Sequence, residues 1–134
     1  MLRYCVDLDG TLAQYKRGDA ALDIEKIGDP LPGSQDFVKR LSEHIGNDGH
    51  NARIIIFTRR MSEVSESGRH SLHKAIVNWL EKHNFVWDEV YDSHGKPDGT
   101  AFIDDRGVQC RPQENPKAYE EAEDYIKNVI LTYR

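Results

Sequence analysis

Four aspartates occur in two closely spaced pairs, and each pair accompanies a short apolar run. Asp7 and Asp9 stand at the end of residues 4–8, and Asp104-Asp105 directly follows residues 101–103. Apolar runs of this length are too short for helices and are typical of buried strands. A carboxylate at the end of a buried strand is costly unless it is paired, hydrogen-bonded or metal-bound. An ordinary turn at Asp9-Gly10 is the alternative, but two such pairs favour a functional site.

Further polar groups lie beside these runs. Thr58 follows a third apolar run over residues 52–57, Gly10-Thr11 follows the first pair, and Lys96 precedes the last run. Four carboxylates in one cleft would raise one another's pKa, and a divalent cation would relieve the repulsion. Oxygen ligands without His or Cys favour Mg²⁺, which leaves room for a substrate phosphate.

The same residue types suit phosphoryl transfer, which depends on positioning and on charge stabilisation. Lys96, the Thr58 hydroxyl and free backbone amides at Gly10-Thr11 would stabilise the phosphoryl oxygens. Asp7 would act as the nucleophile, and Asp9 would protonate the leaving group and later activate water.

The apolar periodicity predicts alternating strands and helices. Residues 13–32 lack a clear period and predict a loop or flap, residues 61–70 give no clear prediction, and residues 86–91 predict a short strand. Such alternation predicts an α/β fold with a mostly parallel sheet, whose ligand site lies at the carboxyl ends of the strands. Three helices are expected: one capped by Ser34 with Phe37, Val38, Leu41 and Ile45 on its apolar face, one over 70–83, and a last one with Tyr119, Ala122, Ile126, Val129 and Ile130.

Length and composition indicate one globular domain over residues 1–134, with 38% hydrophobic and 31% charged residues. The net charge of −5 counts against non-specific nucleic-acid binding, which depends on phosphate neutralisation. No apolar stretch is long enough for a membrane span, and Met1 leads directly into the expected first strand, so no signal peptide is expected. Cys5 and Cys110 are expected to be reduced thiols, so a cytoplasmic location is expected.

Four ordered motifs resemble those of the haloacid dehalogenase (HAD) superfamily. They are Asp7-Leu8-Asp9-Gly10-Thr11, Phe57-Thr58, Lys96 and Ile103-Asp104-Asp105, and together they span roughly residues 4–106. The resemblance implies a Rossmann-like three-layer sandwich and Mg²⁺-dependent phosphoryl transfer. Flap, helices and strands fill the intervals between motifs, which implies a capless member with an open site. Short capless members often oligomerise, so a homo-oligomer is a further expectation.

The resemblance also assigns roles by position, and aspartate at both places of the first motif favours the phosphatase branch. Lys96 lies eight residues before Asp104, closer than in many members; Lys74 and Lys82 are alternatives, but Lys96-Pro97 matches the family pattern better. The implied roles are Asp7 as nucleophile, Asp9 as general acid and base with its carbonyl on Mg²⁺, Thr58 and Lys96 as phosphate ligands, Lys96 also steadying Asp7, and Asp104 and Asp105 as metal ligands. Asp7 is also expected among the metal ligands, and Arg59 among the phosphate ligands.

The substrate is less well defined by the sequence. Lys16, Arg17, Arg59, Arg60 and Arg106 would either bind a second anionic group or form solvated surface charges. The main expectation is a phosphatase for a soluble phosphomonoester such as a sugar phosphate or nucleotide. Asp-Gly-Thr-Leu-Ala and the Trp-Leu-Glu helix also resemble the phosphatase domain of bacteriophage polynucleotide kinase, so a polynucleotide 3′-phosphatase is an alternative, disfavoured by the net acidity. A catalytically idle HAD-like binding module is the third possible function.

Overall fold

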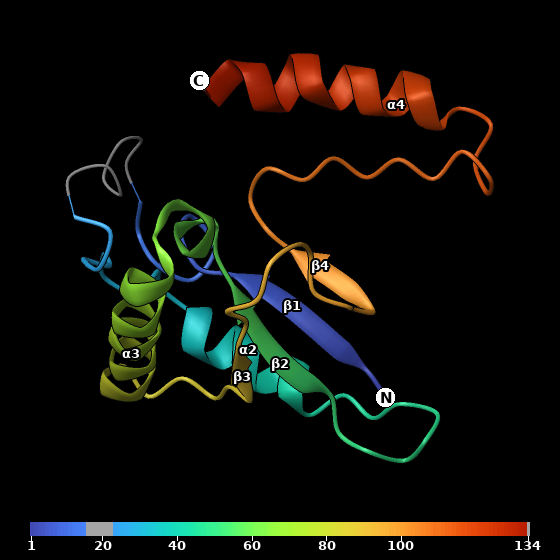
Figure 1. Ribbon diagram of the computed structural model, residues 1–134. Helices are drawn as coiled ribbons and strands as arrows, with labels where there is room; N and C mark the ends of the chain where they lie inside the picture. The colour runs from blue at the N-terminus through green and yellow to red at the C-terminus, as the bar shows by residue number, and fades with distance from the viewer. Residues whose placement is uncertain (16–22, 134) are drawn as a thin grey trace.

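The computed structural model describes residues 1–15 and 23–133, and a parallel sheet forms its centre (Figure 1). The four strands lie in the order β3-β2-β1-β4, and all three pairings are parallel. Their bounds are β1 (Arg3–Asp7), β2 (Arg53–Phe57), β3 (Glu89–Val90) and β4 (Ala101–Ile103). The expected parallel α/β sheet is confirmed, although β3 is shorter than the predicted strand over 86–91.

The helices between these strands differ from the predicted ones at their ends. Helix α2 (Ser34–Ser42) is preceded by Gly33 rather than Ser34 as its N-cap, and it ends before Ile45, which is 66% exposed. Helix α3 (Glu66–Lys82) starts four residues earlier than predicted, because the Ser65 hydroxyl accepts a hydrogen bond from the Gly68 amide and caps it. The 3₁₀ helix η1 (Arg59–Glu63) joins β2 to this cap.

One face of the sheet forms the main hydrophobic core. Alternate residues of a strand point to the same face, and here those of β1 and β2 pack against apolar side chains of α2 and α3. Gln35 on α2 also donates a hydrogen bond to the His83 carbonyl at the end of α3, which places the two helices side by side. The fully buried members are Val6, Leu8, Ile54 and Ile56 near or in the strands, Leu12 and Ala13 in the loop after β1, Val38 on α2, and Leu72, Ile76 and Leu80 on α3.

A loop covers part of the opposite face of the sheet. Cys5 and Ile55 are fully buried there. The Cys5 thiol donates to the Asp98 carbonyl, and a Cβ on Gly99 would lie 2.6 Å from the Cys5 sulfur, so the backbone approaches this strand closely. The three-layer arrangement expected from the family resemblance therefore has loop, rather than helix, against Cys5.

The C-terminal helix stands apart from the sheet (Figure 1). It consists of α4 (Ala118–Tyr125), the π-helical turn η2 (Ile126–Ile130) and the 3₁₀ turn η3 (Leu131–Tyr133). The predicted helix is confirmed, but Tyr119 is 70% exposed and Leu131 is 58% exposed. In the described part of the chain, no helix combines the length and the apolar character needed to cross a membrane. Both cysteines are free.

Candidate active site

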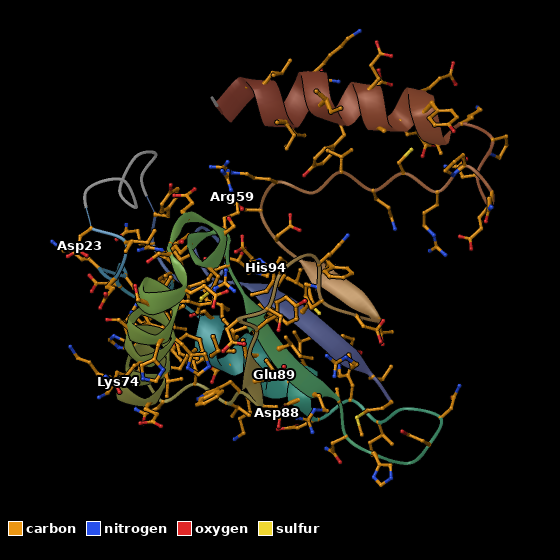
Figure 2. All side chains as sticks on the ribbon, in the orientation of Figure 1. Asp23, Arg59, Lys74, Asp88, Glu89 and His94 are labelled. Carbon is orange, nitrogen blue, oxygen red and sulfur yellow. The ribbon has the colours of Figure 1, made fainter. Side chains whose placement is uncertain are left out.

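A cleft of about 850 Å³ lies at the carboxyl edge of the sheet. Because β1, β2 and β4 run parallel, the residues that follow them meet at this edge. Figure 2 labels Arg59 on η1 and His94 on the loop between β3 and β4, the two segments that flank it. The cleft brings together the sequence-predicted residues Asp7, Asp9, Thr58, Arg59, Lys96, Asp104 and Asp105, and it is also lined by Tyr15, Phe57, Arg60, Ser62, Glu63, Gly95, Pro97, Arg106 and Gly107.

Asp7 is the last residue of β1, and the pKa of its carboxyl group is strongly raised. Burial raises the pKa of Asp7 to about 7. A hydrogen bond of 2.8 Å from the Leu8 amide to Asp7 Oδ1 acts in the opposite direction, and the negative charges of Asp105, Asp9 and Asp104 add to the rise. The predicted repulsion between clustered carboxylates is therefore present at this side chain, and a nearby cation would oppose it.

The raised pKa of Asp7 predicts how stability depends on pH when no divalent cation is present. Between 3.8, its ordinary value, and about 7, the folded protein holds a proton that the unfolded chain has lost. The free energy of unfolding of the wild type therefore decreases as the pH rises from 3.8 to about 7. Relative to wild type, Asp7→Asn should gain up to roughly 2–4 kcal/mol in free energy of unfolding across it.

Urea unfolding of both proteins in chelator, from acidic to mildly alkaline pH, measures this difference. Asp36→Asn is the matched control, because Asp36 is exposed in the first turn of α2 and lies outside the cleft. If the free energies of unfolding of wild type and Asp7→Asn differ by the same amount at every pH, the pKa of Asp7 is not raised.

Asp9 is held by Arg60. Arg60 Nε lies 2.7 Å from Asp9 Oδ2, and Arg60 Nη2 lies 2.9 Å from Asp9 Oδ1, so the contact is bidentate. Arg60 is 2% exposed. The expectation of a solvated surface charge is therefore wrong for Arg60, whose guanidinium is buried and engaged by the first-motif carboxylate, and its binding of a second anionic group stays a prediction.

The two arginines of η1 point in different directions. The side chain of Arg59 is 80% exposed and pairs with Glu63 at 3.5 Å, whereas Arg60 is buried. The sequence shows two adjacent basic residues after a strand and contains no signal that separates them. The 3₁₀ turn makes the distinction, since successive residues of a tight helix point in different directions. Lys16 and Arg17 of the predicted basic group lie outside the described residues.

Thr58 occupies the turn between β2 and η1. It is 8% exposed, and its Oγ1 accepts a hydrogen bond of 3.2 Å from the Arg60 amide, which caps η1. A hydroxyl whose oxygen accepts this bond still has its own hydrogen available to donate. Thr58 lines the cleft, so its position agrees with the predicted contact to a phosphoryl group.

Gly10 and Thr11 are placed differently from the expectation. The Gly10 amide donates to the Ala13 carbonyl at 2.8 Å, and the Thr11 amide donates to the Leu8 carbonyl at 3.4 Å. The prediction that both amides are free to bind phosphate is therefore wrong, because the loop after β1 folds back on itself and uses them. Thr11 Oγ1 is buried, and no hydrogen-bond partner for it occurs among the described residues.

The second aspartate pair follows β4. Asp104 Oδ1 accepts hydrogen bonds from the amides of Arg106, at 2.9 Å, and Gly107, which shapes the turn after the strand. Asp105 lies directly against Gly10, so closely that a Cβ at Gly10 would overlap its carboxylate. This contact joins the loop after β1 to the loop after β4, and thereby the first motif to the last.

The donors of the cleft suit Mg²⁺ in kind. Among the residues that the structure describes, no three His, Cys, Asp or Glu side chains form a ready-made metal cluster. Magnesium requires only one or two carboxylates and keeps several of its waters. The mutually repelling carboxylates around Asp7 supply oxygen ligands of this kind, so Asp7 and Asp104 would hold the ion, with the Asp9 carbonyl and Asp105 beside them.

Lys96 reaches the cleft from the loop before β4. Its Nζ lies 4.0 Å from the centre of the Phe102 ring, a cation–π contact. In the described part of the structure, no hydrogen bond or ion pair joins Lys96 to Asp7. Lys96 is nevertheless the one candidate of the three lysines that lines the cleft, since Lys74 and Lys82 on α3 do not.

Comparisons with known proteins give little further information. A scan against protein-family models and a search of curated proteins both find no match. Among solved structures, the chain is similar to the crystal structure of a target protein from Vibrio cholerae, with 28% sequence identity and a TM-score of 0.47 over 92% of this chain and 98% of that chain. The description of that protein names no activity, and the site is interpreted from its own geometry.

Proposed function

We propose that the protein is a capless HAD-like phosphatase that hydrolyses phosphomonoesters through an aspartyl-phosphate. The observation that carries the proposal is the convergence of all four motif positions in one cleft, although they come from widely separated parts of the chain. Asp7 is the last residue of β1, Thr58 follows β2, and Lys96 and Asp104 flank β4. A site assembled from four separate segments, with a half-buried carboxylate among them, is typical of catalysis rather than of packing.

The proposed reaction uses the first two aspartates in sequence. An Asp7 carboxylate oxygen attacks the phosphorus atom, a phosphorus–oxygen bond forms, and the bond to the leaving alcohol breaks as Asp9 donates a proton to that alcohol. Water then attacks the phosphorus of the aspartyl-phosphate while Asp9 accepts a proton from it, which releases phosphate and restores Asp7. Asp9 must carry a proton for the first step and lose it before the second.

The remaining residues bind and stabilise the phosphoryl group. Thr58 donates its hydroxyl hydrogen, and Lys96, which also lines the cleft, supplies a positive charge. Mg²⁺, when bound, supplies positive charge that offsets the negative charge of the phosphoryl oxygens and of the aspartates. Asp7 has to be ionised to attack, so a cation that lowers its raised pKa also favours the reactive form.

Release of phosphate from an aryl phosphate tests this proposal. We expect activity in Mg²⁺, loss of at least about 10²-fold in excess chelator, and recovery when Mg²⁺ is restored, because the clustered carboxylates need the cation. Activity that is unchanged in chelator would contradict the proposed metal dependence. A protein that binds Mg²⁺ but hydrolyses no phosphomonoester would indicate an idle binding module.

A substrate panel then separates the two proposed classes of substrate. Sugar phosphates and nucleotides stand on one side, and oligonucleotides with a 3′-phosphate on the other. A soluble metabolite should be hydrolysed with little dependence on salt, whereas action on an oligonucleotide should weaken steeply as salt rises. The net charge of −5 favours the soluble substrate.

A further inference from the structure

The surroundings of Arg60 extend beyond the contact with Asp9. A guanidinium that is 98% removed from solvent is unfavourable unless its donors are satisfied. Arg60 satisfies them in two directions: Nε and Nη2 bind Asp9, and Nη1 donates to the carbonyls of Ile24 at 2.7 Å and Lys26 at 2.8 Å. The Asp23 carbonyl lies 3.4 Å from the same nitrogen. One side chain therefore joins a cleft carboxylate to a backbone segment far away in sequence.

The contact with Asp9 fixes the carboxylate while leaving it usable. Two parallel hydrogen bonds from a planar fork determine the plane of the carboxylate as well as its position. Each carboxylate oxygen has a second lone-pair direction, and the Asp9 side chain remains 14% exposed and lines the cleft. Arg60 thus determines which lone pairs of Asp9 face a substrate in the cleft.

The contact with residues 23–26 places that segment relative to the cleft. Figure 2 labels Asp23 at the start of this segment. Two side chains of α3 also hold the region: the Ser71 hydroxyl donates to Glu25 at 2.8 Å, and Trp79 Nε1 donates to the Gly28 carbonyl at 2.9 Å. Of these three anchors, Arg60 is the one that also contacts the first motif.

We propose that Arg60 is a positioning residue, which orients Asp9 for proton transfer and couples that orientation to the order of residues 23–26. Its catalytic consequence rests on the proposed phosphatase function, whereas the coupling itself does not. Lysine cannot reproduce the arrangement, because an ammonium group offers a single point of charge without the planar fork. Arg60→Lys therefore keeps the charge and removes the geometry.

Amide hydrogen exchange tests the coupling without any activity measurement. The Glu25 and Lys26 amides both donate to Asp23, to its carboxylate at 3.0 Å and to its carbonyl at 3.1 Å, and report on the order of the segment. In Asp9→Asn, which leaves Arg60 in place, both amides should exchange about tenfold faster than in wild type. The Ala52 amide, hydrogen-bonded to His44 at the other end of the sheet, serves as internal reference. Unchanged exchange at both amides would overturn the coupling.

A double-mutant cycle in kcat tests the positioning role. Arg60→Lys should lower kcat by about 10–100-fold, and the double variant Asp9→Asn, Arg60→Lys should be no slower than Asp9→Asn alone, because Arg60 acts through Asp9. Arg53→Lys is the control, since Arg53 is half-buried at the opposite end of β2. If the two substitutions lower kcat independently, so that their fold-changes multiply in the double variant, Arg60 is a structural support only.

The two readouts separate failure of this inference from failure of the proposed function. Faster exchange together with a non-additive cycle supports the inference. If the wild type hydrolyses no phosphomonoester, the proposed function fails, and the exchange result alone then supports or overturns the coupling. If Arg60→Lys does not fold, amide exchange in Asp9→Asn still tests the coupling to residues 23–26, because that variant retains the buried guanidinium.

Discussion

Asp7→Asn should lower kcat for phosphomonoester hydrolysis by at least about 10³-fold, because the amide cannot form the aspartyl-phosphate. Asp7 lies at the end of β1, where the Leu8 amide donates to one carboxylate oxygen; the other oxygen would be the one that attacks in the proposed mechanism. The substitution is nearly isosteric, so the fold and the cleft should be retained. Phosphate release with aryl phosphate under saturating Mg²⁺ measures the effect.

The matched control for this result is Asp36→Asn, which makes the same chemical change on an exposed position of α2 and should leave kcat unchanged within twofold or so. Trapping of a radiolabelled phosphoryl group on wild type, but not on Asp7→Asn, would identify the intermediate directly. Hydrolysis by Asp7→Asn at close to the wild-type rate would exclude Asp7 as the nucleophile and with it the proposed mechanism.

Gly10→Ala should destabilise the protein and disturb the site together. Gly10 has φ +80°, a left-handed conformation that costs a residue with a side chain about 1–2 kcal/mol. Its added methyl group would also overlap the Asp105 carboxylate, so the loop after β4 must move. We expect a loss of roughly 2–4 kcal/mol in the free energy of unfolding and at least about tenfold lower kcat.

Gly49→Ala separates the two causes of this effect. Gly49 has φ +79°, nearly the same as Gly10, but a Cβ there would meet no atom within 4 Å. It should therefore show the backbone cost alone, with unchanged kcat. Urea unfolding gives the free energy of unfolding of both variants, and phosphate release gives their kcat. If both variants lose the same free energy of unfolding and Gly10→Ala keeps its activity, the contact with Asp105 does not position the last motif.

Oligomerisation stays a prediction. The large side chains of the C-terminal helix, with Tyr119 and Leu131 the most exposed, provide apolar surface that the rest of the described chain leaves open. This surface would be available to a second copy of the chain in the homo-oligomer that the family resemblance implies.

Local signals in the sequence determined the strands, the parallel α/β class and the clustering of the motif residues. Short apolar runs such as residues 52–57 cannot cover a helix, and polar residues at their ends must meet at one edge of a parallel sheet. The helix ends depend on more than the apolar periodicity: Ser65 caps α3 although the periodicity predicts a start at residue 70, and Gly33, rather than Ser34, is the N-cap of α2. A polar residue before a helix is compatible with several caps, and backbone conformation selects one.

Only the tertiary structure decided which charged and polar groups are already engaged. It buried Arg60 and exposed its neighbour Arg59, because a 3₁₀ turn after β2 directs adjacent side chains differently. The Gly10 amide is used within a folded loop, and Asp105, which lies far from Gly10 in the sequence, packs against it. The sequence by itself determined which chemistry the residues could perform, since that depends on side-chain type and strand position. Their partners depend on contacts between distant segments, which exist only after the chain has folded.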